Sequence, residues 1–100
     1  MEVRVEVFAD RMKVSAGGKS ATVRPSVPYA GRRILVGRFQ PAVDCLRQAL
    51  EKLGASGWLK RKPALRMQAM EMNEGGLSEV EERCLREVGL TAGARSVEVR

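Results

Sequence analysis

Polar and apolar residues alternate strictly at the start of the chain. Between positions 2 and 7 the sequence reads EVRVEV, with three valines separated by charged residues. A period of two places the valines on one face of a strand and the charged residues on the other. We therefore predict a strand with one buried face and one face in water.

Residues 12–23 (MKVSAGGKSATV) predict a β-hairpin, because Gly17 and Gly18 supply the positive φ that a two-residue turn requires. Residues 24–31 (RPSVPYAG) contain two prolines, which break regular structure. The apolar run that follows, at 32–39 (RRILVGRF), is interpreted as a third or fourth short strand.

The period then changes to that of a helix over residues 41–54 (PAVDCLRQALEKLG). Pro41 suits the first turn of a helix, and Gly54 suits a left-handed residue after its end. The apolar positions at helical spacing are Val43, Leu46, Leu50 and Leu53.

Alternation returns at residues 64–72 (ALRMQAMEM), which predict a strand with Leu65, Met67 and Ala69 on one side. Residues 75–89 (GGLSEVEERCLREVG) predict a second helix, with a capping box between Ser78 and Glu81. We expect this helix to end at Gly89, and its apolar stripe to consist of Leu77, Val80, Cys84, Leu85 and Val88. Residues 95–100 (RSVEVR) predict a last strand.

The predicted order is β-β-β-α-β-α-β, an α/β fold with a five-stranded mixed sheet in the order 3-2-1-4-5. Right-handed crossovers that move the same way across this sheet place both helices on one face. The other face is then open and charged, and it is either solvated or receives a partner. The residues expected to line it are Glu2, Arg4, Glu6, Arg66, Gln68, Glu98 and Arg100.

Composition fits one small domain over residues 1–100, with 44% apolar residues. Eighteen basic against twelve acidic residues give a net charge of +6, which favours an anionic partner or surface. No run approaches the roughly 20 apolar residues of a membrane span. Cys45 and Cys84 form no CxxC motif and are interpreted as reduced thiols of a cytosolic protein.

The sequence does not favour catalysis. It contains no histidine to activate a serine or cysteine. The GGKS at 17–20 lies between two predicted strands, whereas a phosphate-binding loop lies between a strand and a helix. The alternative to a protein-binding module is a small basic nucleic-acid-binding domain, to which Arg32, Arg33 and Arg38 would contribute. No aromatic ladder interleaves these cations, so nucleic acid is the less favoured partner.

Residues 77–99 (LSEVEERCLREVGLTAGARSVEV) resemble a segment of the bacterial actin-like MreB family, the rod shape-determining proteins, that reads roughly VTEVERRAVREAALEAGAREVYL. Upstream, GGKSATVRPSV resembles that family's GKGIVLNEPSV, and GRRILVGRF resembles its KVLAVGEEA. The resemblance covers about 90 residues in order and only the first subdomain of the family. It implies an actin-like fold of the ribonuclease-H-like type.

This sequence departs from the family where nucleotide chemistry resides. The family's Asp-x-Gly-Thr loop is replaced by Asp10, Arg11 and Met12, and its catalytic glutamate lies beyond the last strand that matches. The resemblance therefore implies the fold and argues against ATP hydrolysis, so we expect no cofactor and no enzymatic activity. It implies a non-catalytic interaction module in cell-shape control, with an actin-like filament protein as partner and with homodimer formation left open.

The only tryptophan lies in GWLKRKP, residues 57–63. In the MreB family the matching loop carries hydrophobic residues that enter the membrane. An indole beside cations suits an anionic lipid surface, though binding would be weak. The alternatives are a lid over the helix end and a contact with nucleic acid or an acidic protein. The residues expected to contact membrane or partner are Trp58, Leu59, Lys60, Arg61 and Lys62, which would place a cytoplasmic protein at the periphery of the inner membrane.

Overall fold

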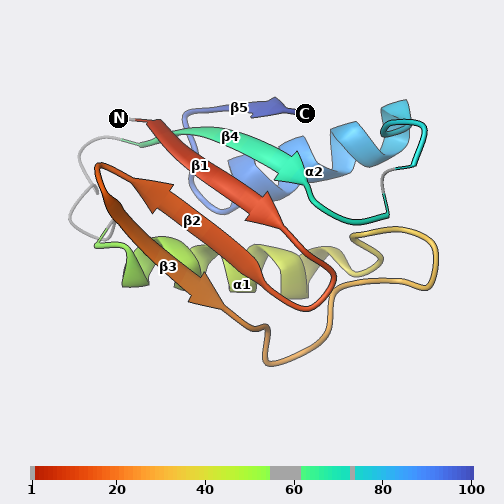
Figure 1. The fold of residues 1–100 in the computed structure, drawn as a ribbon, viewed down its shortest axis with the longest axis horizontal. Coiled ribbons are helices and arrows are strands. Elements are labelled where there is room, and N and C mark those ends of the chain that lie inside the picture. The colour runs from red at the N-terminus through yellow and green to blue at the C-terminus, as the bar shows by residue number, and fades with distance from the viewer. Residues whose placement is uncertain (1, 55–61, 73) are drawn as a thin grey trace.

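The computed structural model describes residues 2–54, 62–72 and 74–100, and it has the predicted α/β topology (Figure 1). Its five strands form one mixed sheet in the order β3-β2-β1-β4-β5. The elements are β1 (Glu2–Val7), β2 (Met12–Ala16), β3 (Lys19–Val23), α1 (Phe39–Lys52), β4 (Ala64–Ala69), α2 (Glu79–Thr91) and β5 (Ser96–Val99).

Strand β1 is at the centre of the sheet. It pairs antiparallel with β2, where Val5 faces Val14, and parallel with β4, where Val5 faces Met67. Strands β4 and β5 are also parallel. Both helices lie behind the sheet in Figure 1, so the predicted two-layer arrangement with one open sheet face is confirmed.

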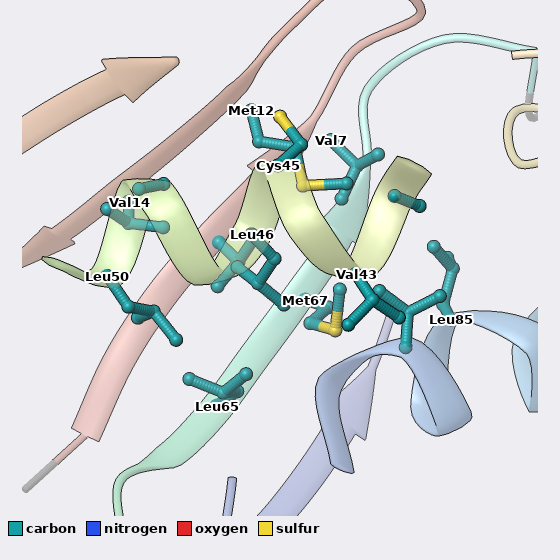
Figure 2. Close-up of a cluster of buried hydrophobic side chains, with 14 of the residues drawn as sticks. Val7, Met12, Val14, Val43, Cys45, Leu46, Leu50, Leu65, Met67 and Leu85 are labelled. Carbon is teal, nitrogen blue, oxygen red and sulfur yellow. The ribbon is translucent and has the colours of Figure 1, made fainter. Parts of the chain in front are cut away.

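The core lies between the sheet and the two helices (Figure 2). The three valines of β1 are completely buried, as are Met67 of β4 and Leu46 of α1. Full burial of one such side chain stabilises the fold by about 1.5 to 3 kcal/mol. The alternation of β1 thus fixes which face of the sheet receives the helices.

The hairpin and the helix cap form as predicted. Gly17 and Gly18 have φ values of 56° and 80°, which are those of a two-residue turn between β2 and β3. The Ser78 hydroxyl accepts a hydrogen bond from the Glu81 backbone N–H at 3.2 Å, and the Glu81 carboxylate accepts one from the Ser78 N–H at 3.2 Å. This capping box begins α2.

The prediction of a strand at residues 32–39 is wrong. The segment is a loop whose two ends meet, because the Tyr29 carbonyl accepts hydrogen bonds from the N–H groups of Gly37 at 2.7 Å and Arg38 at 2.9 Å. Its apolar side chains pack into the core although the segment is not a strand, since Leu35 and Val36 are buried. Helix α1 then begins at Phe39, two residues earlier than expected.

Two expectations for α2 are also wrong. The helix continues past Gly89 to Thr91, because Gly89 marks a close approach to the sheet and not a helix end. A Cβ atom at Gly89 would lie 2.6 Å from Cγ2 of Val97, so a larger residue there would require a neighbouring side chain to move. Val80 is 78% exposed and lies outside the buried stripe.

Candidate interaction site on the open sheet face

The open face carries the charged residues that alternation assigned to it. Arg4 of β1, Arg66 of β4 and Glu98 of β5 occupy one row across the sheet, since Arg4 is in register with Arg66 and Arg66 with Glu98. All three are exposed. The neighbouring strands therefore present a continuous polar surface opposite the helices.

Arg66 lies between two carboxylates. Its Nε atom is 3.3 Å from Oε1 of Glu2 and 3.6 Å from Oε2 of Glu98. The side chains are about half exposed, so each pair contributes only about 0 to 1 kcal/mol. The two carboxylates hold the Arg66 guanidinium in place more than they stabilise the fold.

Arg4 has a different environment. Like charges directly opposite each other destabilise a sheet, and Arg4 directly faces Arg66. Its NH2 group donates a hydrogen bond of 3.4 Å to Oε1 of Gln68. Among the described residues, no carboxylate pairs with Arg4.

A hollow of about 160 Å³ lies among three arginines, Arg4, Arg66 and Arg100, and is completed by Met67 and Gln68. The Arg100 NH2 group is 3.5 Å from Glu98, which holds it beside the hollow. Guanidinium groups donate forked hydrogen bonds that match the geometry of carboxylates and phosphates. The hollow is therefore suited to an anionic group of a partner.

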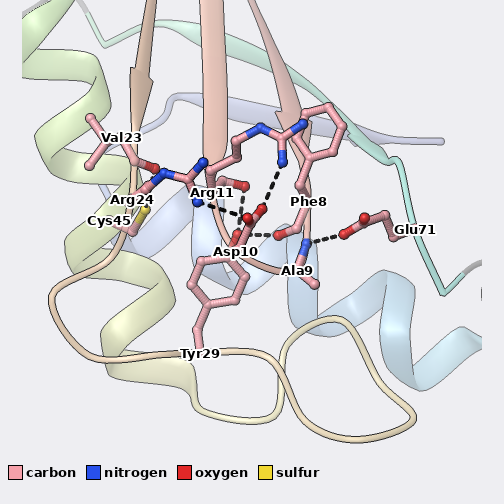
Figure 3. Close-up of polar contacts among 9 residues, drawn as sticks. All are labelled: Phe8, Ala9, Asp10, Arg11, Val23, Arg24, Tyr29, Cys45 and Glu71. Carbon is pink, nitrogen blue, oxygen red and sulfur yellow. Dashed lines mark hydrogen bonds and ion pairs between the residues drawn. The ribbon is translucent and has the colours of Figure 1, made fainter.

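A second polar cluster lies at the turn between β1 and β2 (Figure 3). The Asp10 carboxylate is 2.8 Å from NH1 of Arg24 and 2.7 Å from NH1 of Arg11, and these hydrogen bonds lower the Asp10 pKa below its ordinary 3.8. The Ala9 N–H donates a hydrogen bond of 2.5 Å to Oε2 of Glu71, which follows β4.

Tyr29 closes this cluster from the loop side. Its side chain is completely buried, and its hydroxyl lies within hydrogen-bond distance of the carbonyl oxygens of Phe8 and Arg11. This turn is where the family resemblance places a phosphate loop. Here its carbonyl groups and its carboxylate are engaged by residues of the same chain, so the contacts around Asp10 fix the turn.

Most of the tryptophan stretch lies outside the described residues, including Trp58, Leu59, Lys60 and Arg61. Lys62 is described and exposed. It is followed by Pro63, which is buried and whose carbonyl accepts a hydrogen bond of 2.8 Å from the Arg95 N–H. The predicted membrane or partner contact of this stretch stays a prediction.

The two cysteines are free thiols, as predicted. Cys45 is buried, and burial raises the pKa of its thiol from 9.0 to about 11. Burial also raises the pKa of the half-buried Cys84. Neither helix in the described part of the chain is long and apolar enough to cross a bilayer.

The alternation of the strands predicted which residues lie on the open face but not the hollow among them, because a period of two identifies a face and does not indicate where each guanidinium group points. The contacts of the turn around Asp10 were not predicted. Arg24, which pairs with Asp10, Tyr29, which donates to the carbonyls of Phe8 and Arg11, and Glu71, which accepts from Ala9, come from segments without regular structure, where no periodic signal exists. The one available signal was the tyrosine, whose hydroxyl usually has a partner when the ring is buried.

Comparison with known proteins adds one relative. In an alignment 77 residues long that covers 72% of the chain, the chain is 42% identical to a protein of Escherichia coli (strain K12) described as "Uncharacterized protein YjaA". The matched part of the chain spans 59% of that protein's length. No family model matches the chain.

Proposed function

We propose that the chain is a non-catalytic interaction module that binds an acidic surface of a partner protein on its open sheet face. The observation that supports this proposal is the hollow among Arg4, Arg66 and Arg100. Arg4 faces another arginine and has no carboxylate partner among the described residues, which disfavours the fold. A carboxylate from a partner would remove this repulsion.

The partner class comes from the family resemblance. That resemblance implies an actin-like filament protein of the cell-shape machinery, at the periphery of the inner membrane. The strand order of the sheet supports this choice, because it is the order that the resemblance implies. Fold alone does not determine function, so the partner has to be tested directly.

The test compares two double variants that lose the same charge. Arg4→Gln with Arg100→Gln removes two arginines of the hollow, whereas Arg83→Gln with Arg95→Gln removes two exposed arginines elsewhere. Binding of each to a purified actin-like rod-shape protein is measured by fluorescence anisotropy. Hydrogen bonds to charged groups contribute about 1.5 to 3 kcal/mol, so the affinity of the hollow variant should be at least about tenfold lower than that of the parent.

The control variant should bind within about twofold of the parent, since long-range charge is screened beyond a Debye length of about 8 Å. Equal losses of affinity in the two double variants would mean that binding depends on net charge and not on the hollow. Absence of binding by the parent would exclude this partner class.

A further inference from the structure

The excess of positive over negative charge in the chain comes from one stretch of the sequence. Between Arg11 and Val43 there is no aspartate or glutamate and there are seven lysines and arginines. Outside it lie eleven basic and twelve acidic residues. This stretch forms β2, β3, the loop that follows and the first turn of α1, on the side of the molecule where β3 is the edge strand (Figure 1).

Within residues 2–54, 62–72 and 74–100, no backbone group of another segment forms a hydrogen bond with the outer edge of β3. In a two-residue hairpin the residues that flank the turn, Ala16 and Lys19, exchange hydrogen bonds, and bonded and non-bonded pairs then alternate. Lys19, Ala21 and Val23 therefore bond to β2. Ser20 and Thr22 direct their N–H and C=O groups away from the sheet.

The edge is only partly protected against strand addition, because Lys19 is its one charged residue. Within β3 there is no proline, and its five residues pair one-to-one with those of β2, without a bulge. The ends of the edge adjoin two hollows of different chemistry. At the hairpin end, a hollow of about 370 Å³ is lined by Lys13, Lys19 and the hydroxyl-bearing Ser15 and Ser20, together with the backbone of the turn.

At the other end of β3, a hollow of about 290 Å³ lies between the loop and α1. Its apolar lining comes from Val27, Pro41 and Cys45, and Val27 is 47% exposed. Its polar lining consists of Ser26, Gln40, Asp44 and Gln48. Cys45 connects this hollow to the strand, since its thiol donates to the Val23 carbonyl at 3.5 Å. An extended chain beside β3 would thus have a basic hollow at one end and a mainly apolar hollow at the other.

We propose that the free edge of β3 binds an extended acidic segment of a partner protein as a sixth strand. Backbone groups of Ser20 and Thr22 pair with the segment, a carboxylate lies at Lys13 and Lys19, and an apolar side chain lies against Val27. In such strand addition the main chain supplies affinity and the flanking hollows supply specificity. This surface is separate from the open-face hollow of the proposed function.

The other occupants fit less well. A second copy of the chain would bring its own β3, and the lysines and arginines around it, against the same basic edge. Nucleic acid would match the charge, but it has no backbone that pairs with N–H and C=O groups at strand spacing. The basic stretch offers only Phe39 as a partly exposed aromatic ring, because its tyrosine is buried.

The test begins with selection of twelve-residue peptides from a random display library against the folded chain. One enriched peptide is synthesised, labelled with fluorescein and titrated by anisotropy. Thr22→Pro removes an N–H that points away from β2, so the hairpin keeps its own hydrogen bonds and circular dichroism checks the fold. Lys13→Glu with Lys19→Glu reverses the basic hollow without touching the backbone.

We expect the enriched peptides to be acidic with alternating apolar residues. Each variant should weaken binding at least tenfold, whereas Arg4→Gln with Arg100→Gln should change it less than twofold. Bound peptide should slow amide hydrogen exchange at Ser20 and Thr22. If Thr22→Pro does not fold, the affinity of the lysine variant and the amide hydrogen exchange at Ser20 and Thr22 test the proposal instead.

Three results would overturn the proposal. One is selection without enrichment, and another is a peptide that binds the folded variants as tightly as the parent. The third is a labelled twenty-nucleotide DNA that binds with steep salt dependence while no peptide protects Ser20 and Thr22. Failure here leaves the open-face test unaffected, because the two tests use different variants.

Discussion

Tyr29→Phe tests whether the turn between β1 and β2 is fixed from the loop. The Tyr29 ring is completely buried, and its hydroxyl is the only part that the substitution removes. The Arg11 carbonyl keeps a second donor, the Phe8 N–H at 2.9 Å. The Phe8 carbonyl loses the Tyr29 hydroxyl as its hydrogen-bond donor.

The magnitude follows from these contacts. Leaving a buried acceptor without its partner costs about 1 to 3 kcal/mol. The Phe8 carbonyl is only partly buried, so the lower part of this range applies, and the packing of the ring is unchanged. We expect the free energy of unfolding to fall by about 1 to 2 kcal/mol. For a domain of this size that lowers the melting temperature by roughly 5 to 15 °C.

Urea unfolding followed by circular dichroism measures the change, with Ser20→Ala as the control because it removes an exposed hydroxyl. The control should stay within about 0.5 kcal/mol of the parent. A loss below about 0.5 kcal/mol in Tyr29→Phe would refute the reasoning. It would mean that the hydroxyl contributes nothing to the turn.

Two further predictions concern packing and pH. Gly89→Ala gains about 1 kcal/mol of helix propensity, but its Cβ would lie 2.6 Å from Val97 and 3.0 Å from Met67. Overpacking costs about 1 to 3 kcal/mol, so we expect net destabilisation in a thermal melt, and a more stable variant would contradict the contact. The Cys45 pKa is raised from 9.0 to about 11, so the folded state keeps a proton that the unfolded chain loses. This contribution to stability is complete below pH 9 and is lost as the pH rises from 9 to 11. Cys45→Ala should therefore lose less stability than the parent between pH 8 and 10.5 in urea unfolding, and equal losses would assign the alkaline change to other groups.

Periodicity predicted the parts of the fold that repeat. The valines of β1 and the alternation of β4 gave both strands and their buried face, because a period of two has only two possible faces. Ser78 and Glu81 gave the start of α2, because a capping box is a local contact. The strand order 3-2-1-4-5 was predicted as part of the fold, and right-handed crossovers then placed both helices on one face; both predictions are confirmed.

The structural roles of the glycines and of the short apolar runs were predicted less accurately. Ile34, Leu35 and Val36 form a run that suits a strand or a buried loop equally. The hydrogen bonds that Gly37 and Arg38 donate to the Tyr29 carbonyl close the chain on itself. Gly89 suits a helix end or a close approach, and the choice depends on Val97, a neighbour from the next element. Such contacts between distant segments leave no periodic pattern.

The central position of β1 has a consequence for how the chain acquires its structure. Its parallel neighbour β4 is about sixty residues away in sequence, since Glu2 pairs with Ala64. During synthesis, the hairpin of β2 and β3 closes early, while the other side of β1 waits for a distant strand. A nascent chain that ends before β4 leaves one edge of β1 unpaired, on a strand with a fully apolar face. The interval between emergence of β1 and of β4 is therefore when aggregation or chaperone capture is most favoured.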